Sequence, residues 1–255
     1  MDRQAVTAFL MSLIAGLSTG LGGLIVVFSD GTSTAFLSFA LAFSAGIMVT
    51  VSLADLLPTA AAAFVGSYGP GKGAVMLLIP MVMGIFFAQL IDALTPEAAP
   101  SPGEGIDRRK LGRLGVISAA AILLHNLPEG MAIGSGASHD AQMGLTLAVL
   151  IALHNIPEGM SIGVPLIAGG MAKWKAVLLT ALSGAPTLVG GALGAYLGSG
   201  GDALVAISLA LAAGAMLYVT YCEILPQVIL LNQERGPAVF TIMGIILGLL
   251  MVHAL

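Results

Sequence analysis

Residues 125–134 and 154–163 read HNLPEGMAIG and HNIPEGMSIG, and this nearly identical pair decides how the chain is interpreted. Each copy lies inside a long apolar stretch, one from 114 to 137 and the other from 143 to 167. An imidazole, an amide and a carboxylate are costly to place in hydrocarbon, so their presence at that depth twice indicates a functional site. The pair therefore predicts a polar site inside a membrane.

The composition of the chain excludes a soluble protein. Of its 255 residues, 58% are hydrophobic and 9% are charged, whereas soluble domains carry about 25% charged residues. A net charge of −4 on so few ionisable groups predicts neither nucleic-acid binding nor a polybasic membrane-surface protein. The single cysteine, Cys222, excludes an intramolecular disulfide and any metal site built from several cysteines.

A membrane-spanning helix needs about 20 mostly apolar residues, and eight segments meet this requirement. The sequence therefore predicts an all-α integral membrane protein whose residues 1–255 form a single transport domain. The predicted spans are 5–28, 35–57, 74–94, 114–137, 143–167, 174–198, 203–230 and 237–254. Residues 95–113, rich in proline and glycine near their start, are expected to form a flexible cytoplasmic loop. The stretch before the first span has no basic region, so we expect that span to be retained rather than cleaved as a signal.

The basic residues predict that both termini lie outside the cell. With that orientation, the inner connections hold most of the positive charge: Arg108, Arg109, Lys110, Arg113, Lys173, Lys175 and Arg235. The outer side holds only Arg3 and Lys72.

A second repeat relates the two ends of the chain. Residues 45–48 (AGIM) and 55–58 (DLLP) match 213–216 (AGAM) and 223–226 (EILP), with a constant offset of 168 residues (213 minus 45, and 223 minus 55). The predicted spans that carry these patterns run in opposite directions. The two repeats together predict an inverted-topology fold, in which spans 1–3 are mirrored by spans 6–8 around spans 4 and 5. Such folds place the substrate site near the midplane, between the repeats.

The spacing within each motif brings its polar side chains together. Residues four apart share one face of a helix, so His125 lies one turn from Glu129, as His154 does from Glu158. Each histidine is about a dozen residues into its span, or roughly 18 Å deep at 1.5 Å per residue. Two antiparallel spans would therefore hold both motifs at one level.

The donor types at this level favour a transition metal. Proline cannot donate a backbone hydrogen bond, so Pro128 frees the carbonyl of Leu124, and Pro157 frees that of Leu153. Free carbonyls at membrane depth are tolerated where they line a cavity or bind an ion. Imidazole and carboxylate together suit Zn²⁺ and Fe²⁺, whereas Ca²⁺ and Mg²⁺ prefer oxygen ligands alone. Metal binding at this site should displace protons.

Residues outside the paired motifs leave alternatives open. Met216 is expected to fill space in its helix, and Met48 either does the same or faces the ion with its thioether. Asp55 and Glu223, related by the 168-residue offset, are either interfacial charges or gate residues on the transport pathway. Three further side chains lie near helix ends or loops, where solvated groups are expected: Asp92, His139 and His253.

The paired His-Asn-x-Pro-Glu-Gly motifs resemble those of the ZIP (Zrt-, Irt-like protein) family, and most closely its bacterial zinc-uptake branch. The likeness covers essentially the whole chain, including the eight spans, the outward termini and the longer inner loop after span 3. It implies a 3+2+3 inverted-repeat fold with a binuclear metal site between spans 4 and 5. By this resemblance, the main transport metal would be held by His125, Glu129, His154 and Glu158, with Met48 joining from span 2. Asn126 and Asn155 would join the two glutamates around a second metal.

Two features depart from the family pattern. Many relatives carry a glutamate on span 6 in a Ser-Gly-x-x-Glu pattern, where this chain has Thr187 at the end of Ser183-Gly184-Ala185-Pro186-Thr187. A neutral hydroxyl replaces the charge, which leaves open whether the site holds one metal or two. The inner loop also has no histidine, so no metal-sensing role is expected for it.

We therefore predict a transporter that moves divalent metal ions into the cytoplasm, Zn²⁺ first, with Fe²⁺, Mn²⁺ and Cd²⁺ as alternatives. Asp55 would attract the cation at the outer mouth, while Glu223 and Asp92 would lie near the exit. The resemblance implies that a unit of spans 1, 4, 5 and 6 slides against the other four. No cofactor beyond the transported metal is expected. The expected location is a bacterial inner membrane, and the small-residue ridges, such as Gly190, Gly194 and Gly198, permit a homodimer.

Two rival functions remain. The first is an intramembrane metal-dependent hydrolase with glutamate as the base, although the chain has no His-Glu-x-x-His motif and its symmetric motifs provide no distinct nucleophile. The second is a proton-coupled carrier of organic substrates. That function would favour a basic residue at mid-depth or an aromatic pocket, and the chain has one Trp, four Tyr and no central Lys or Arg.

Overall fold

The computed structural model describes residues 3–28, 34–94, 108–197 and 202–254. Every regular element in these ranges is helical. In chain order the elements are α1 (Arg3–Phe28), α2 (Thr34–Thr50), η1 (Val51–Leu56), α3 (Leu57–Tyr68), α4 (Pro70–Leu94), α5 (Arg108–His139), α6 (Ala141–Ala168), α7 (Lys173–Ser183), α8 (Ala185–Leu197), α9 (Asp202–Tyr218), η3 (Val219–Ile224), α10 (Leu225–Leu231) and α11 (Gly236–Ala254).

Within the described residues, eight helical stretches are long and apolar enough to cross a membrane. Three of them are composite: α2–η1–α3, α7–α8 and α9–η3–α10. This result confirms the all-α class and the number of spans. Helix α5 begins at Arg108, so residues 108–113, predicted as part of a loop, are helical, while residues 95–107 lie outside the described ranges.

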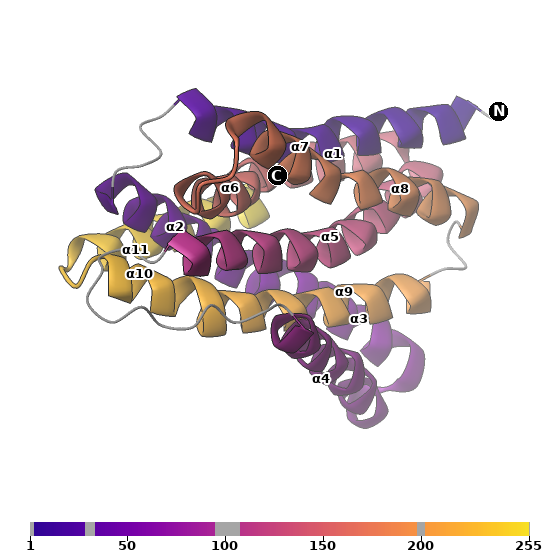
Figure 1. Cartoon of the computed structure of the whole chain (residues 1–255). Helices are drawn as coiled ribbons and strands as arrows, with labels where there is room; N and C mark the ends of the chain where they lie inside the picture. Colours follow the sequence, from indigo (N-terminus) through magenta and orange to yellow (C-terminus); the bar gives the residue numbers. More distant parts are fainter. Residues whose placement is uncertain (1–2, 29–33, 95–107, 198–201, 255) are drawn as a thin grey trace.

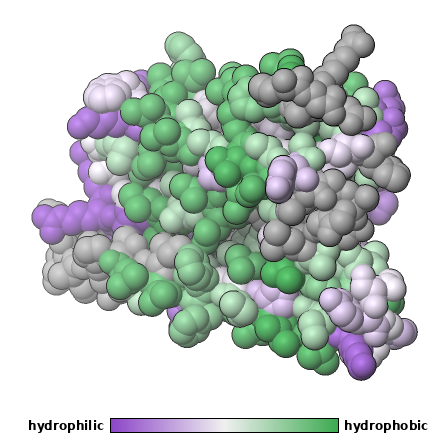
Figure 2. All heavy atoms as spheres, turned by 90° about the vertical axis from the view of Figure 1, so that its right-hand side faces the viewer, coloured by the Kyte–Doolittle hydropathy of each residue, from purple (hydrophilic) through white to green (hydrophobic). Residues whose placement is uncertain are grey.

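The outer surface of the bundle is apolar, as a bilayer requires. Large hydrophobic side chains are exposed along α1, α4 and α11, for example Ile14, Phe86 and Leu250. Figure 2 shows hydrophobic residues over much of one face, with the most hydrophilic ones gathered toward its left and lower right margins. In water such a surface would be an aggregation hazard, whereas against lipid it carries no penalty.

Helix α5 lies at the centre of the bundle. In Figure 1 it runs between α1 and α9, and it also packs along α6 and α8. Helix α1 packs along α6, α7 and α8. Helix α2 packs against α11 and α6, while α4 packs against α9 and α3. The two motif-bearing helices, α5 and α6, therefore lie inside the bundle, with their paired motifs shielded from lipid.

Glycines allow the central helices to cross in direct backbone contact. A methyl group on Gly16 of α1 or on Gly184 at the α7–α8 junction would overlap the carbonyl oxygen of the other. Two residues of the predicted ridge, Gly190 and Gly194 of α8, pack against the backbone of α5, and the third, Gly198, lies outside the described residues. These two positions are therefore not available to hold a second copy of the chain. Small residues serve close helix approach in a membrane, where lipid removes the hydrophobic drive.

Two π-helical turns interrupt the second and seventh spans. η1 covers Val51–Leu56 and η3 covers Val219–Ile224, and both their starts and their ends are 168 residues apart (219 minus 51, and 224 minus 56). Each is followed within two residues by a proline, Pro58 or Pro226, at the start of the next helix. A proline cannot donate the backbone hydrogen bond that an α-helix requires. The wider π-helical turn lets the chain continue as a helix past the proline. The second span thus reaches Tyr68, where the sequence predicted a helix to residue 57.

Candidate metal centre

His125 and Glu129 form the nucleus of the candidate centre on α5. They are four residues apart, and the imidazole Nε2 lies 2.8 Å from the Glu129 carboxylate Oε1. Glu158 of α6 approaches the same nitrogen, at 3.5 Å from its Oε1. All three side chains are buried, none more than 2% exposed. The structure therefore brings both glutamates of the paired motifs to a single imidazole.

The charge at this point calls for a cation. Two ionised carboxylates carry more negative charge than one imidazolium can balance, and ionised groups inside a membrane are stable only when they are paired. Ligand atoms on a tetrahedral zinc lie roughly 3.3 Å apart, given zinc–nitrogen and zinc–oxygen distances near 2.0–2.1 Å. The His125–Glu158 separation of 3.5 Å already suits such an ion, whereas the 2.8 Å contact of His125 with Glu129 would have to widen.

The two motif asparagines are fixed by backbone partners on neighbouring helices. Asn126 Nδ2 donates to the carbonyl of Ser183 at 2.7 Å, and Asn155 Nδ2 donates to the carbonyl of Ala15 at 2.9 Å. A carbonyl oxygen only accepts, so the contacting atom of each amide must be its nitrogen. Each amide oxygen, Oδ1, is buried and has no hydrogen-bond partner among the described residues. Both oxygens thus remain available to a ligand.

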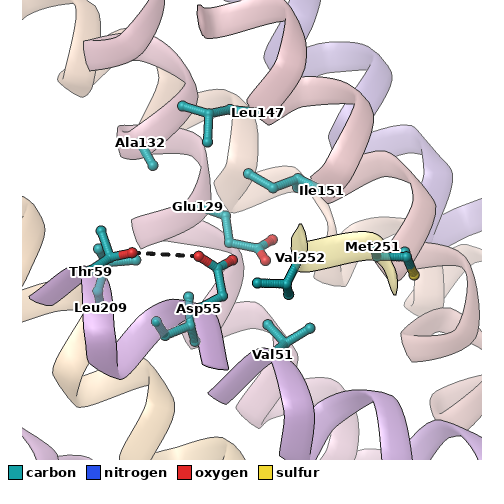
Figure 3. Close-up of a pocket in the computed structure, with 11 residues that line it drawn as sticks. Val51, Asp55, Thr59, Glu129, Ala132, Leu147, Ile151, Leu209, Met251 and Val252 are labelled. Atoms are coloured by element: carbon teal, nitrogen blue, oxygen red, sulfur yellow. Dashed lines mark hydrogen bonds between the residues drawn. The ribbon is translucent and has the colours of Figure 1, made fainter. Parts of the chain in front are cut away.

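A cavity of about 100 Å³ reaches the centre from one side. Glu129 and Asp55 point toward one another across it (Figure 3). The hydroxyl of Thr59 donates to Asp55 Oδ1 at 3.5 Å, and the remaining wall is mainly apolar, including Met251 and Val252 of α11. The π-helical turn η1 carries Asp55, so this irregular segment presents a carboxylate to the cavity.

A second cavity continues the first toward the end of the bundle. The two share four lining residues, which are Thr59, Ala132, Leu147 and Leu209. The second extends to Ser67, near the end of α3, and to Met143, near the start of α6. Together they form a route lined by Ser67, Ser135 and Thr59 that leads to Asp55 and Glu129.

Comparison with known proteins shows the family of the chain. The family model described as ZIP Zinc transporter matches residues 106–255. A relative from Streptococcus mutans, described as zinc transporter ZupT, is 35% identical over 260 residues, covering 99% of this chain and 97% of the relative. Relatives of the same description from Chlorobium chlorochromatii and Lysinibacillus sphaericus are 34% identical (99% and 97% coverage) and 39% identical (89% of each). The chain belongs to the ZIP zinc transporter family.

Family membership identifies the chain as a membrane transporter and not an enzyme, and it confirms the resemblance that the paired motifs carry. These comparisons give no support to the hydrolase alternative. Together with the eight apolar helices, they identify a multi-pass membrane protein whose substrate class is a divalent metal ion.

The described contacts do not include several residues that the sequence predicted for the site of this ZIP protein. The side chains of His154 and Asp92 are outside the described part of the structure. Met48 is fully buried in the apolar core of the bundle. Glu223 is half-buried in η3, the counterpart of the turn that carries Asp55. Among the described residues, no three His, Cys, Asp or Glu side chains are spaced to enclose a metal ion, so the assignment of ligands remains a prediction.

The other two histidines are His139 and His253. The side chain of His139 is outside the described residues. His253 is exposed near the end of α11, where its Nδ1 lies 3.0 Å from the carbonyl of Leu249.

Sequence reasoning missed residues whose roles depend on tertiary contact. Ser44 of α2 donates to the carbonyl of Pro157 at 2.8 Å and so ties the second span to the α6 motif. Thr59 contacts Asp55 from the next turn of α3. In the sequence, Ser44 lies one turn before Met48, and Thr59 lies one turn after Asp55. These spacings were the only available signals, and they are common in any helix.

Proposed function

We propose that this ZIP protein carries Zn²⁺ into the cytoplasm through a centre formed by the paired motifs of α5 and α6. The ligands would come from His125, Asn126, Glu129, His154, Asn155 and Glu158, with Met48 adjoining. Fe²⁺, Mn²⁺ and Cd²⁺ are alternative substrates with similar ligand preferences. The observation that carries the proposal is the convergence of Glu129 and Glu158 on the buried imidazole of His125.

The positions of the basic residues support the predicted orientation of the chain in the membrane. Gly112, in the first turns of α5, contacts Gly169 at the end of α6. Lys173, at the start of α7, donates to the carbonyl of Val27 near the end of α1 at 3.2 Å. These contacts gather the basic segments 108–113 and 173–175 at one end of the bundle, which the positive-inside rule assigns to the cytoplasm.

The cavities open toward the other end. Their lining includes Val252 near the C-terminus, Met143 near the start of α6 and Ser67 near the end of α3. With the termini outside, in a bacterial inner membrane, the route from Ser67 to Glu129 is an entrance from outside. Asp55 would attract the hydrated cation, and Glu223 and Asp92 would lie on the exit side.

Alternating access would come from an inverted 3+2+3 repeat. The Gly16–Gly184 contact joins two residues that are 168 positions apart (184 minus 16), as are the two π-helical turns. A unit of the first, fourth, fifth and sixth spans would slide against the other four and expose the centre inward, as the family resemblance implies. Mirrored halves with a site at their interface are typical of secondary transporters.

Zinc uptake into proteoliposomes that contain an impermeant fluorescent zinc indicator tests the proposal. Glu158→Gln keeps the size of the side chain but removes its charge, and we expect it to abolish saturable uptake. Glu234→Gln makes the same chemical change at an exposed position and should leave uptake intact. Unchanged uptake in Glu158→Gln would refute the assignment of the pathway to the paired motifs.

A further inference from the structure

Four buried oxygens without partners lie on the helices that surround the candidate centre. Two are the amide oxygens of Asn126 and Asn155, and two are the hydroxyl oxygens of Thr19 on α1 and Thr187 on α8. All four side chains are fully buried, and none of these oxygens has a hydrogen-bond partner among the described residues. A buried oxygen without a hydrogen-bond partner is unfavourable, so four on adjoining helices call for an explanation.

The two threonines occupy equivalent places in the two halves of the fold. They are 168 residues apart (187 minus 19), the offset that also relates Gly16 to Gly184 and η1 to η3. Both lie at the crossing of the first and sixth spans. A methyl group on Gly184 would be 3.0 Å from Thr19 Oγ1, and one on Gly16 would be 3.3 Å from Thr187 Cβ.

Each threonine also adjoins one motif. The carbonyl of Thr19 is in direct contact with Gly159, the residue after Glu158. The carbonyl of Thr187 is in the same contact with Gly130, the residue after Glu129. One turn earlier on each helix, the backbone holds a motif asparagine through the bonds from Asn155 to Ala15 and from Asn126 to Ser183. The pair therefore flanks the glutamates symmetrically.

Charge limits what this arrangement can hold. Hydroxyl and amide oxygens are neutral, so the negative charge of the described centre comes from Glu129 and Glu158. One divalent ion balances these two carboxylates. A second ion would bring two more positive charges, of which Asp55, facing Glu129 across the cavity, offsets only one. An uncompensated charge in a site of low dielectric is strongly unfavourable.

We infer that the transport site holds one divalent ion at a time, and that Thr19 and Thr187 set this number by keeping the position beside Asn126 and Asn155 uncharged. The inference rests on the proposed function, because it takes the two glutamates as metal ligands. A carboxylate at either threonine would supply the missing charge. The symmetry of the pair means that both threonines should respond alike.

Equilibrium dialysis of the purified protein in detergent against buffered Zn²⁺, with elemental analysis of the bound metal, tests this number. The zinc lost on going from the wild type to the double variant Glu129→Gln, Glu158→Gln counts the ions at the site and excludes those on the surface. We expect a difference of one. The number of zinc ions bound at the site should rise toward two in Thr187→Glu and likewise in Thr19→Glu. Gln142→Glu, which adds a carboxylate at an exposed position, should leave that number at one.

The outcomes separate the inference from the proposed function. A difference of two ions in the wild type would overturn the single-ion site while leaving the ligands in place. A difference of zero, with zinc still bound, would overturn the ligand assignment itself. Gel filtration shows whether Thr19→Glu is folded. An increase in bound zinc in Thr187→Glu, with no increase in a folded Thr19→Glu, would refute the equivalent role of the two threonines. If neither glutamate variant folds, the wild-type difference alone decides the number.

Discussion

His125 is the residue at which the two halves of the candidate centre meet. Its imidazole contacts a carboxylate from its own helix and another from the neighbouring helix. The sequence predicted the pairing with Glu129, because four residues separate the two on one helix. The approach of Glu158 depended on how α5 and α6 pack, and the partners of the asparagines, Ser183 and Ala15, lie 57 and 140 residues away along the chain. Such long-range partners cannot be read from local spacing.

The asparagines are expected to stabilise the protein as well as to serve the site. In Asn155→Ala the carbonyl of Ala15 loses its donor inside the bundle, which should cost about 1–3 kcal/mol. Asn126→Ala should cost a similar amount, because Ser183 loses the equivalent bond. Thermal unfolding in detergent without metal would measure both losses. A variant as stable as the wild type would show that its bond contributes nothing to the fold.

Asp55 should affect the capture of the ion more than its passage. It faces Glu129 across the cavity, and a carboxylate that lines a cavity raises the local concentration of cations there. Asp55→Asn should therefore raise the zinc concentration for half-maximal uptake by roughly tenfold, with little change in the maximal rate. Thr59→Val, which keeps the charge and removes the hydroxyl, should have a smaller effect. Concentration-dependent uptake would measure both, and an equal fall in the maximal rate would contradict an entry role.

At the scale of the elements, the apolar runs predicted eight spans because a bilayer imposes both length and composition. The π-helical turns were not predicted, although the repeated Asp55–Pro58 and Glu223–Pro226 patterns lie where they occur. A proline permits a kink, a helix end or a wider turn, and the choice among these depends on packing against α9, α2 and their neighbours.

The glycines that follow the motif glutamates should tolerate no side chain. In Gly159→Ala the added methyl group would overlap the carbonyl oxygen of Thr19, and such overpacking costs about 1–3 kcal/mol. Gly66→Ala is the matched control, because nothing lies within 4 Å of an added methyl group there and alanine is the better helix former by about 0.5–1 kcal/mol. Unfolding temperatures in detergent should fall for the first variant and hold or rise for the second. The reverse order would contradict the described contact between α1 and α6.

At the scale of the whole molecule, composition and the paired motifs predicted the class and the family, and both are confirmed. The direction of insertion and the inverted repeat remain predictions. The contact of Gly16 with Gly184 and the matching η1 and η3 turns support the repeat. The contact is not visible in the sequence, because only the folded chain brings Gly16 and Gly184 together.

Cysteine labelling in intact cells would test the orientation. In a Cys222→Ser background, Lys72→Cys should react with a membrane-impermeant maleimide, because the start of α4 is predicted to lie outside. Glu234→Cys should react only after the cells are opened, because the connection before α11 is predicted to lie inside. The opposite pattern would invert the topology and, with it, the proposed direction of transport.

The most direct test of the central claim is an X-ray absorption spectrum at the zinc edge of the purified protein with one equivalent of Zn²⁺. A centre formed by the paired motifs predicts nitrogen and oxygen ligands at about 2.0–2.1 Å, together with outer-shell scattering from imidazole. That scattering should weaken in His125→Gln and stay unchanged in His253→Gln, which alters an exposed histidine near the end of α11. A wild-type spectrum without imidazole scattering, or one that His125→Gln leaves unchanged, would contradict a metal centre at the paired motifs.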